Sequence, residues 1–191
     1  MTHDRDVIQE LTADHHDVDH TIERIDAVPP HDPERKRLVD RLTAELVAIA
    51  VAEEECVLPT VRDRVPDGRA LVDREMHDLG EIERILAELA ARDASDEDFD
   101  RLVGELKSAV ARQEHDDEDG LFVTLHAAFS AEDLDTMGDE VRHAMQYART
   151  RPHLQTPDTP PEYDLLSTAS IDFVDGIRAF FHRHRHTRPA Q

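Results

Sequence analysis

Four polar residues occupy positions where the helical pattern of this sequence otherwise places apolar side chains. Apolar residues recur every three or four positions, as on the buried face of an α-helix. The polar residues at such positions are His15, Glu53, Gln113 and Asp117. Gln113 and Asp117 are four residues apart, as are Ile49 and Glu53, so each pair lies on one helix face. The sequence therefore predicts one imidazole, two carboxylates and one amide inside a hydrophobic core.

Two carboxylates in a core have two chemical interpretations. A buried, ionised carboxylate without a partner costs several kcal/mol or takes up a proton. A metal ion removes this cost, and histidines and carboxylates on facing helices are the ligands from which helix bundles build metal sites. Alternatively, a protonated His15 bridges Glu53 and Asp117, and Gln113 donates a further hydrogen bond. That arrangement leaves about one negative charge in the core, which is tolerable if a little water enters.

Four long segments with helical spacing would position these residues. The segments run from Ile8 to Ile25, from Leu38 to Val57, from Val72 to Leu89 and from Phe99 to Leu121. No alternating pattern typical of a strand competes with them. The connections are only a few residues long, which favours antiparallel neighbours. We therefore expect an all-α fold, an antiparallel up-down-up-down four-helix bundle.

Prolines and capping residues mark the expected ends of these helices. The sequence Val-Pro-Pro at 28–30 ends the first helix, and Asp32 followed by Pro33 opens the second. Pro59 should end or kink the second helix. Residues 95–98 resemble a capping box, and residues 130–133 should cap a shorter fifth helix.

The charge divides the chain into regions. The chain has 191 residues and a formal net charge of −22, and residues 1–150 contain 39 of its 44 acidic side chains. Residues 151–191 have five acidic and five basic residues. We expect a bundle over residues 1–150, a proline-rich linker over 151–169, and a basic, histidine-rich tail with an amphipathic helix over 170–191.

The composition excludes several classes of protein. The acidity argues against a nucleic-acid partner, because such proteins need a basic face. No segment has the roughly 20 apolar residues that would cross a membrane, and no signal peptide is evident. The single cysteine, Cys56, allows no internal disulfide. The expectation is a soluble, cytoplasmic protein, and no catalytic motif identifies it as an enzyme.

Three sequence stretches resemble the hemerythrin-like proteins with an HHE cation-binding domain. They are LTADHHDVDH at 11–20, AEEECVLPTVRDRVPDG at 52–68 and RTRPHLQTPDTPP at 149–161. The resemblance covers about residues 7–162. It implies a four-helix bundle that usually holds a non-haem di-iron centre. Such centres are associated with oxygen, nitric oxide or peroxide chemistry, or with iron and redox sensing.

The resemblance also implies a ligand set, which this sequence matches only in part. The family pattern is His on the first helix, HisxxxGlu on the second, His on the third and HisxxxGlu on the fourth. His15 and Glu53 match their positions, and Asp117 is a carboxylate in place of the fourth-helix Glu.

Three of the four family histidines are missing from the chain. The replacing residues are Ile49, Leu79 and Gln113, of which only the amide has a donor atom, and that donor is weak. His77 and His115 lie two residues from Leu79 and Gln113, a rotation of about 200° that directs them away from the core.

Glu75 and Glu114 flank the site and could each add an oxygen ligand. With a single imidazole, such a site suits one Mn²⁺, Fe²⁺ or Mg²⁺ ion better than a redox pair of irons.

The sequence thus supports a metal-binding bundle with a reduced non-haem site for iron or another divalent metal, formed by His15, Glu53, Gln113 and Asp117. It would sense or handle iron, oxygen or a related small species such as a diatomic ligand. The alternative is a metal-free scaffold that acts as an interaction or regulatory module. A di-iron enzyme is least favoured, and no protein partner is indicated.

Overall fold

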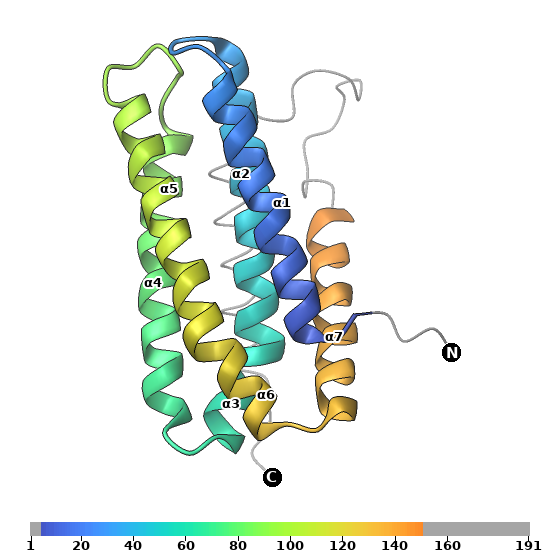
Figure 1. The fold of residues 1–191 in the computed structure, drawn as a ribbon. Helices are drawn as coiled ribbons and strands as arrows, with labels where there is room; N and C mark the ends of the chain where they lie inside the picture. The colour runs from blue at the N-terminus through green and yellow to red at the C-terminus, as the bar shows by residue number, and fades with distance from the viewer. Residues whose placement is uncertain (1–4, 151–191) are drawn as a thin grey trace, which may run out of the picture.

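The computed structural model describes residues 5–150, with side chains described as far as residue 146. The predicted linker and tail, residues 151–191, lie outside this range. The long helices are α1 (Val7–Ala27), α2 (Pro33–Ala52), α4 (Gly68–Ala90), α5 (Phe99–Asp116) and α7 (Ala131–Thr150). Figure 1 shows α1, α2, α4 and α5 as a four-helix bundle. The predicted all-α bundle is confirmed.

The fifth long helix covers one side of the bundle. α7 packs against both α1 and α2, and α4 and α5 pack against each other on the opposite side. Gly138 allows this approach, because a Cβ there would lie 2.6 Å from the carbonyl oxygen of Arg5. Arg142 adds an ion pair of 2.7 Å to Glu10. The N-terminal turn of α1 is therefore fixed to α7.

Two helices of the bundle are interrupted at equivalent places by π-helical turns. The segment η1 (Glu53–Val57) follows α2, and η2 (Asp117–Leu121) follows α5. Each is succeeded by a seven-residue helix, α3 (Leu58–Arg64) or α6 (Phe122–Ala128). Pro59 is the second residue of α3 and has no N–H to donate, and the interruption predicted at this proline is confirmed by the π-helical turn just before it.

Most helix ends agree with the sequence, but one cap differs, and the fifth helix, which was predicted to be shorter, has 20 residues like α2. Ser130 and Asp133 exchange hydrogen bonds at the start of α7, so the cap predicted at 130–133 is confirmed. The capping box predicted at 95–98 is wrong, because α5 begins after Asp98 without a side-chain cap. The Asp98 carboxylate instead accepts a hydrogen bond of 3.0 Å from Arg92.

The core of the bundle consists of aliphatic side chains with a few phenylalanines. None of the described helices is both long and apolar enough to cross a membrane.

The buried side chain of Arg35 donates hydrogen bonds of 2.8 Å to the carbonyl oxygens of Ile25 and Val28. Arg35 thus caps the end of α1, where the Ile25 carbonyl also accepts a hydrogen bond from the N–H of Val28.

Candidate metal centre

The four polar residues predicted to face inward are all buried. The exposed fractions are 7% for His15, 2% for Glu53, 5% for Gln113 and 0% for Asp117. They come from α1, η1, α5 and η2, so the bundle brings together residues more than 100 positions apart in sequence. The i, i+4 spacing explains part of this burial, because it keeps Glu53 on the same helix face as Ile49 and Asp117 on the same face as Gln113.

Asp117 is at the centre of this group. Its Oδ2 lies 3.4 Å from His15 Nε2 and accepts a hydrogen bond of 3.2 Å from Gln113 Nε2. Its Oδ1 is buried without a hydrogen-bond partner among the described residues. One oxygen of this carboxylate is therefore already used, and the other is available to a ligand.

The structure adds a third carboxylate, Glu75, to the cluster. This residue lies one turn before Leu79 on α4 and is 5% exposed. Burial, the charge of Asp117 and a hydrogen bond with Asp117 raise the pKa of Glu75 to about 8. This shift favours the protonated form of Glu75, which can donate a hydrogen bond to Asp117.

Glu53 completes the set of buried carboxyl groups. Burial first, and then the charges of Asp117, Glu75 and Asp14, raise its pKa well above the usual value. Its Oε1 has no hydrogen-bond partner within the described part of the chain. Without a cation, burial favours the protonated form of Glu53, since an unpaired charge in such a place is costly.

His15 is the only imidazole in the cluster. Burial lowers its pKa, but the hydrogen bond and charge of Asp117, with the charges of Glu114 and Glu118, outweigh burial and raise the pKa overall. Its ring stacks on Phe122 with centroids 5.6 Å apart. Its Nδ1 is buried and has no hydrogen-bond partner among residues 5–146. From the sequence, His15 was predicted to bridge Glu53 and Asp117. The structure contains the contact between His15 and Asp117.

The three positions that lack the family histidine surround a small apolar cavity. Ile49, Leu79 and Gln113 line a space of about 20 Å³ between α2 and α4. Its other walls are mostly aliphatic: Leu46, Val47, Ala50, Ile82, Glu83 and Leu86. A space of this size holds one water molecule at most. This side of the cluster offers no imidazole to a second metal ion.

The cluster contains one imidazole and is not preassembled as a metal site among the described residues. In the part of the chain that the structure describes, no three His, Cys, Asp or Glu side chains are already arranged around a shared metal position. The raised pKa values of Glu53 and Glu75 favour protonation, which offsets the negative charge, and a cation would have to displace these protons. His77 and His115 are exposed, as predicted. The oxygen-rich donors that remain suit Mn²⁺, Fe²⁺ or Mg²⁺.

Cys56 does not contribute a thiolate to the site. It lies in η1 and is half-buried. Burial, together with the charges of Glu140 and Glu55, raises the pKa of its thiol to about 11. A thiol that stays protonated at neutral pH is a poor nucleophile and a poor metal ligand.

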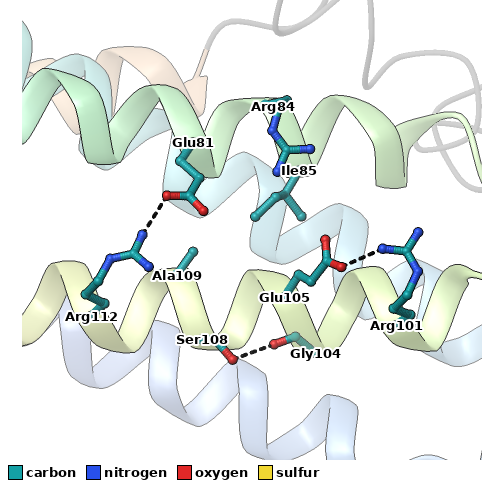
Figure 2. Close-up of a pocket in the computed structure, with 9 residues that line it drawn as sticks. All are labelled: Glu81, Arg84, Ile85, Arg101, Gly104, Glu105, Ser108, Ala109 and Arg112. Carbon is teal, nitrogen blue, oxygen red and sulfur yellow. Dashed lines mark hydrogen bonds and ion pairs between the residues drawn. The ribbon is translucent and has the colours of Figure 1, made fainter.

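A separate groove of about 380 Å³ lies between α4 and α5 on the surface of the bundle. Figure 2 shows three arginines along it, Arg84, Arg101 and Arg112. Arg112 pairs with Glu81 at 2.7 Å, and Arg101 pairs with Glu105. The groove is therefore lined by ion pairs and is distinct from the buried cluster.

Comparisons with known proteins agree with the fold. The sequence matches the profile of the hemerythrin HHE cation-binding domain over residues 6–125. The crystal structure of a hemerythrin HHE cation-binding domain-containing protein from Mycobacterium kansasii superposes with a TM-score of 0.68. The two chains are 16% identical, and the match covers 76% of this chain and 88% of the other. No protein of curated function matches the sequence.

Proposed function

Because the chain belongs to the hemerythrin HHE cation-binding domain family, we propose that it binds one divalent cation at the buried cluster. His15, Glu53, Gln113 and Asp117 would hold this ion, together with Glu75. The observation that supports the proposal is the burial of three carboxyl groups with two oxygens, Glu53 Oε1 and Asp117 Oδ1, that lack hydrogen-bond partners in the described chain. A cation would satisfy both oxygens and neutralise the cluster.

Each residue would have a distinct part in binding. Glu53 and Asp117 would supply negative charge, and His15 would supply the nitrogen ligand. Gln113 would either give its amide oxygen or keep its hydrogen bond to Asp117. Glu75 would lose its proton and become the third carboxylate.

This ligand set favours sensing or handling of a metal ion over redox catalysis. A bound Mn²⁺, Fe²⁺ or Mg²⁺ would supply a positive charge and open coordination positions for a small ligand. Ile49 and Leu79 provide no donor for a second iron. A partner would then detect the cation through its effect on the stability of the bundle.

The specific observation that favours the competing function, a metal-free interaction module, is the set of bonds at Asp117. Gln113 and Glu75 each share a hydrogen bond with Asp117, and His15 lies 3.4 Å away. These contacts stabilise the cluster to some extent without any ion. The two functions differ in whether a cation changes the stability of the bundle.

Thermal unfolding in the presence and absence of cation tests the proposal. Mn²⁺ at about one hundred times its Kd should stabilise the parent by about 2.7 kcal/mol. Asp117→Asn should lose most of this gain. Asp119→Asn is the matched control, since Asp119 lies in the same π-helical turn but its side chain is 76% exposed. Equal Mn²⁺ gains in the parent and Asp117→Asn would contradict the proposed site.

A further inference from the structure

A second hollow of about 530 Å³ lies on the outer side of α4. Among the described residues its lining comes from α4 alone and includes Gly80, Glu83, Ala87 and Ala91. Glu83 also lines the small apolar cavity between α2 and α4, so it borders both spaces. The small side chains at 80, 87 and 91 leave room there for larger apolar side chains from another segment.

α2 is apolar on every side where it approaches this part of α4. Residues 46–52 read Leu-Val-Ala-Ile-Ala-Val-Ala, and all seven are buried. A helix that is apolar all round belongs in the interior of a protein. The backbones of α1 and α7 approach α2 closely, but the backbone of α4 approaches it less closely. The outer side between α2 and α4 is therefore where the bundle can accept a further segment.

The charge of the bundle is complementary to one end of the same chain. Residues 1–150 contain 39 acidic and 17 basic side chains, whereas residues 177–191 contain four arginines, three histidines and no acidic residue. At the hollow, Arg84 pairs with Glu88 and Arg92 pairs with Asp98. These pairs neutralise the arginines of the hollow, and Glu83 adds a carboxylate between the two spaces.

The amphipathic segment predicted near the C-terminus matches the hollow in length. Its apolar stripe runs from Ile171 through Val174 and Ile177 to Phe181 and would be about 15 Å long as a helix. The hollow runs along α4 from Gly80 to Ala91, a rise of about 16 Å.

The connection from α7 is long enough for this segment to reach the hollow. Residues 151–170 include four prolines, and an extended chain of this length spans about 60 Å. α4 has 23 residues and is about 35 Å long. Since α7 packs on α2, the connection also starts on the α2 side of the bundle (Figure 1).

We propose that the segment 171–181 of this chain docks as a helix in the hollow on the α2–α4 side of the bundle. Its apolar stripe would lie on Ala87 and Ala91, and the arginines and histidines that follow it would face the acidic surface. The docked segment would cover the apolar side of α2 and remove more apolar area from water. This inference does not depend on cation binding.

Tryptophan fluorescence of the full-length protein tests the docking, because the chain has no tryptophan of its own. Phe181→Trp places a single fluorophore on the apolar stripe. Its emission should be blue-shifted, and its quenching by acrylamide severalfold weaker, relative to the same variant unfolded in urea.

A second substitution tests the position of the segment. Ala87→Lys, added to Phe181→Trp, puts a long cationic side chain into the hollow and should shift the emission to the red and strengthen quenching severalfold. Ala111→Lys is the matched control, since Ala111 is exposed on α5 and does not line the hollow, and it should leave the emission unchanged. Circular dichroism checks that both variants are folded, and Ala91→Lys gives the same test if Ala87→Lys destabilises α4.

Three results would overturn the inference. Emission of Phe181→Trp as red-shifted as in urea would show that the segment is exposed to water. Blue-shifted emission that neither Ala87→Lys nor Ala91→Lys alters would place the segment on another surface. A blue shift that disappears on dilution, together with dimers in light scattering, would show that the hollow receives the segment of a second copy.

Discussion

Glu53 and Asp117 each begin a π-helical turn, on two different helices, and both are buried in the same cluster. The N–H of Leu58 bonds to the carbonyl of Glu53, and the N–H of Phe122 bonds to the carbonyl of Asp117. Such i to i+5 turns are rare in proteins overall, and those that occur are frequently at functional sites. The charge of Asp117 contributes to the raised pKa of Glu53, so the two carboxyl groups influence each other.

Stability should fall as pH rises when no cation is present. The pKa of Glu75 is raised to about 8, and those of Glu53 and His15 are also raised. The folded state therefore holds protons that the unfolded chain has released, and this contribution is lost as pH rises through about 8. In chelator, the melting temperature should be lower at pH 8.5 than at pH 6.

A single substitution should reduce this pH dependence. Glu75→Gln keeps the shape of a protonated carboxyl group and has no proton to lose, so its melting temperature should change less between pH 6 and 8.5. The control is Glu97→Gln on the surface, which should behave as the parent does. A melting temperature that rises with pH in the parent would contradict the protonated cluster.

Removing both buried carboxyl charges should separate stability from cation binding. In chelator at pH 7.5, Glu53→Gln with Asp117→Asn should be at least as stable as the parent, because neutral amides avoid the cost of burying carboxyl groups that ionise. On addition of Mn²⁺, only the parent should gain stability. Chemical unfolding with and without Mn²⁺ measures both effects. A large loss in chelator would show that the ionised carboxylates themselves stabilise the fold.

The attachment of α7 should depend on Gly138. A Cβ at this position would lie 2.6 Å from the Arg5 carbonyl oxygen and 2.8 Å from the backbone nitrogen of Val7. Gly138→Ala should cost about 1–3 kcal/mol, as overpacked sites do. Gly80→Ala is the control, because a Cβ there meets nothing within 4 Å. In the interior of α4 it should stabilise by about 0.5–1 kcal/mol. Urea unfolding measures the free energy of unfolding of both variants. A Gly138→Ala variant as stable as the parent would contradict the close contact between α7 and the start of α1.

The helices and the inward positions of the cluster could be predicted from sequence because burial follows helical periodicity. The burial of Glu75 is harder to predict from helical periodicity. It is four residues before Leu79 and three after Val72, a spacing that signals the buried face, but the neighbouring Met76 fits the apolar pattern equally well. The structure buries Glu75 and leaves Met76 half-buried.

The π-helical turns and one cap could not be predicted for a different reason. A regular period of 3.6 residues contains no sign of a wider turn, although Pro59 indicated that the second helix is interrupted nearby. At the start of α5, the ion pair between Arg92 and Asp98 replaced the expected cap. Such a pairing depends on how the loop folds and not on the local capping pattern.

Metal content is the measurement that tests the central claim most directly. The untagged protein is reconstituted anaerobically with Fe²⁺ or Mn²⁺, desalted and analysed by plasma mass spectrometry, beside His15→Ala. His16→Ala is the matched control, because His16 is exposed on the same helix. We predict one metal ion per chain, lost in His15→Ala and kept in His16→Ala. Two ions per chain, or retention unaffected by His15→Ala, would contradict a single buried site.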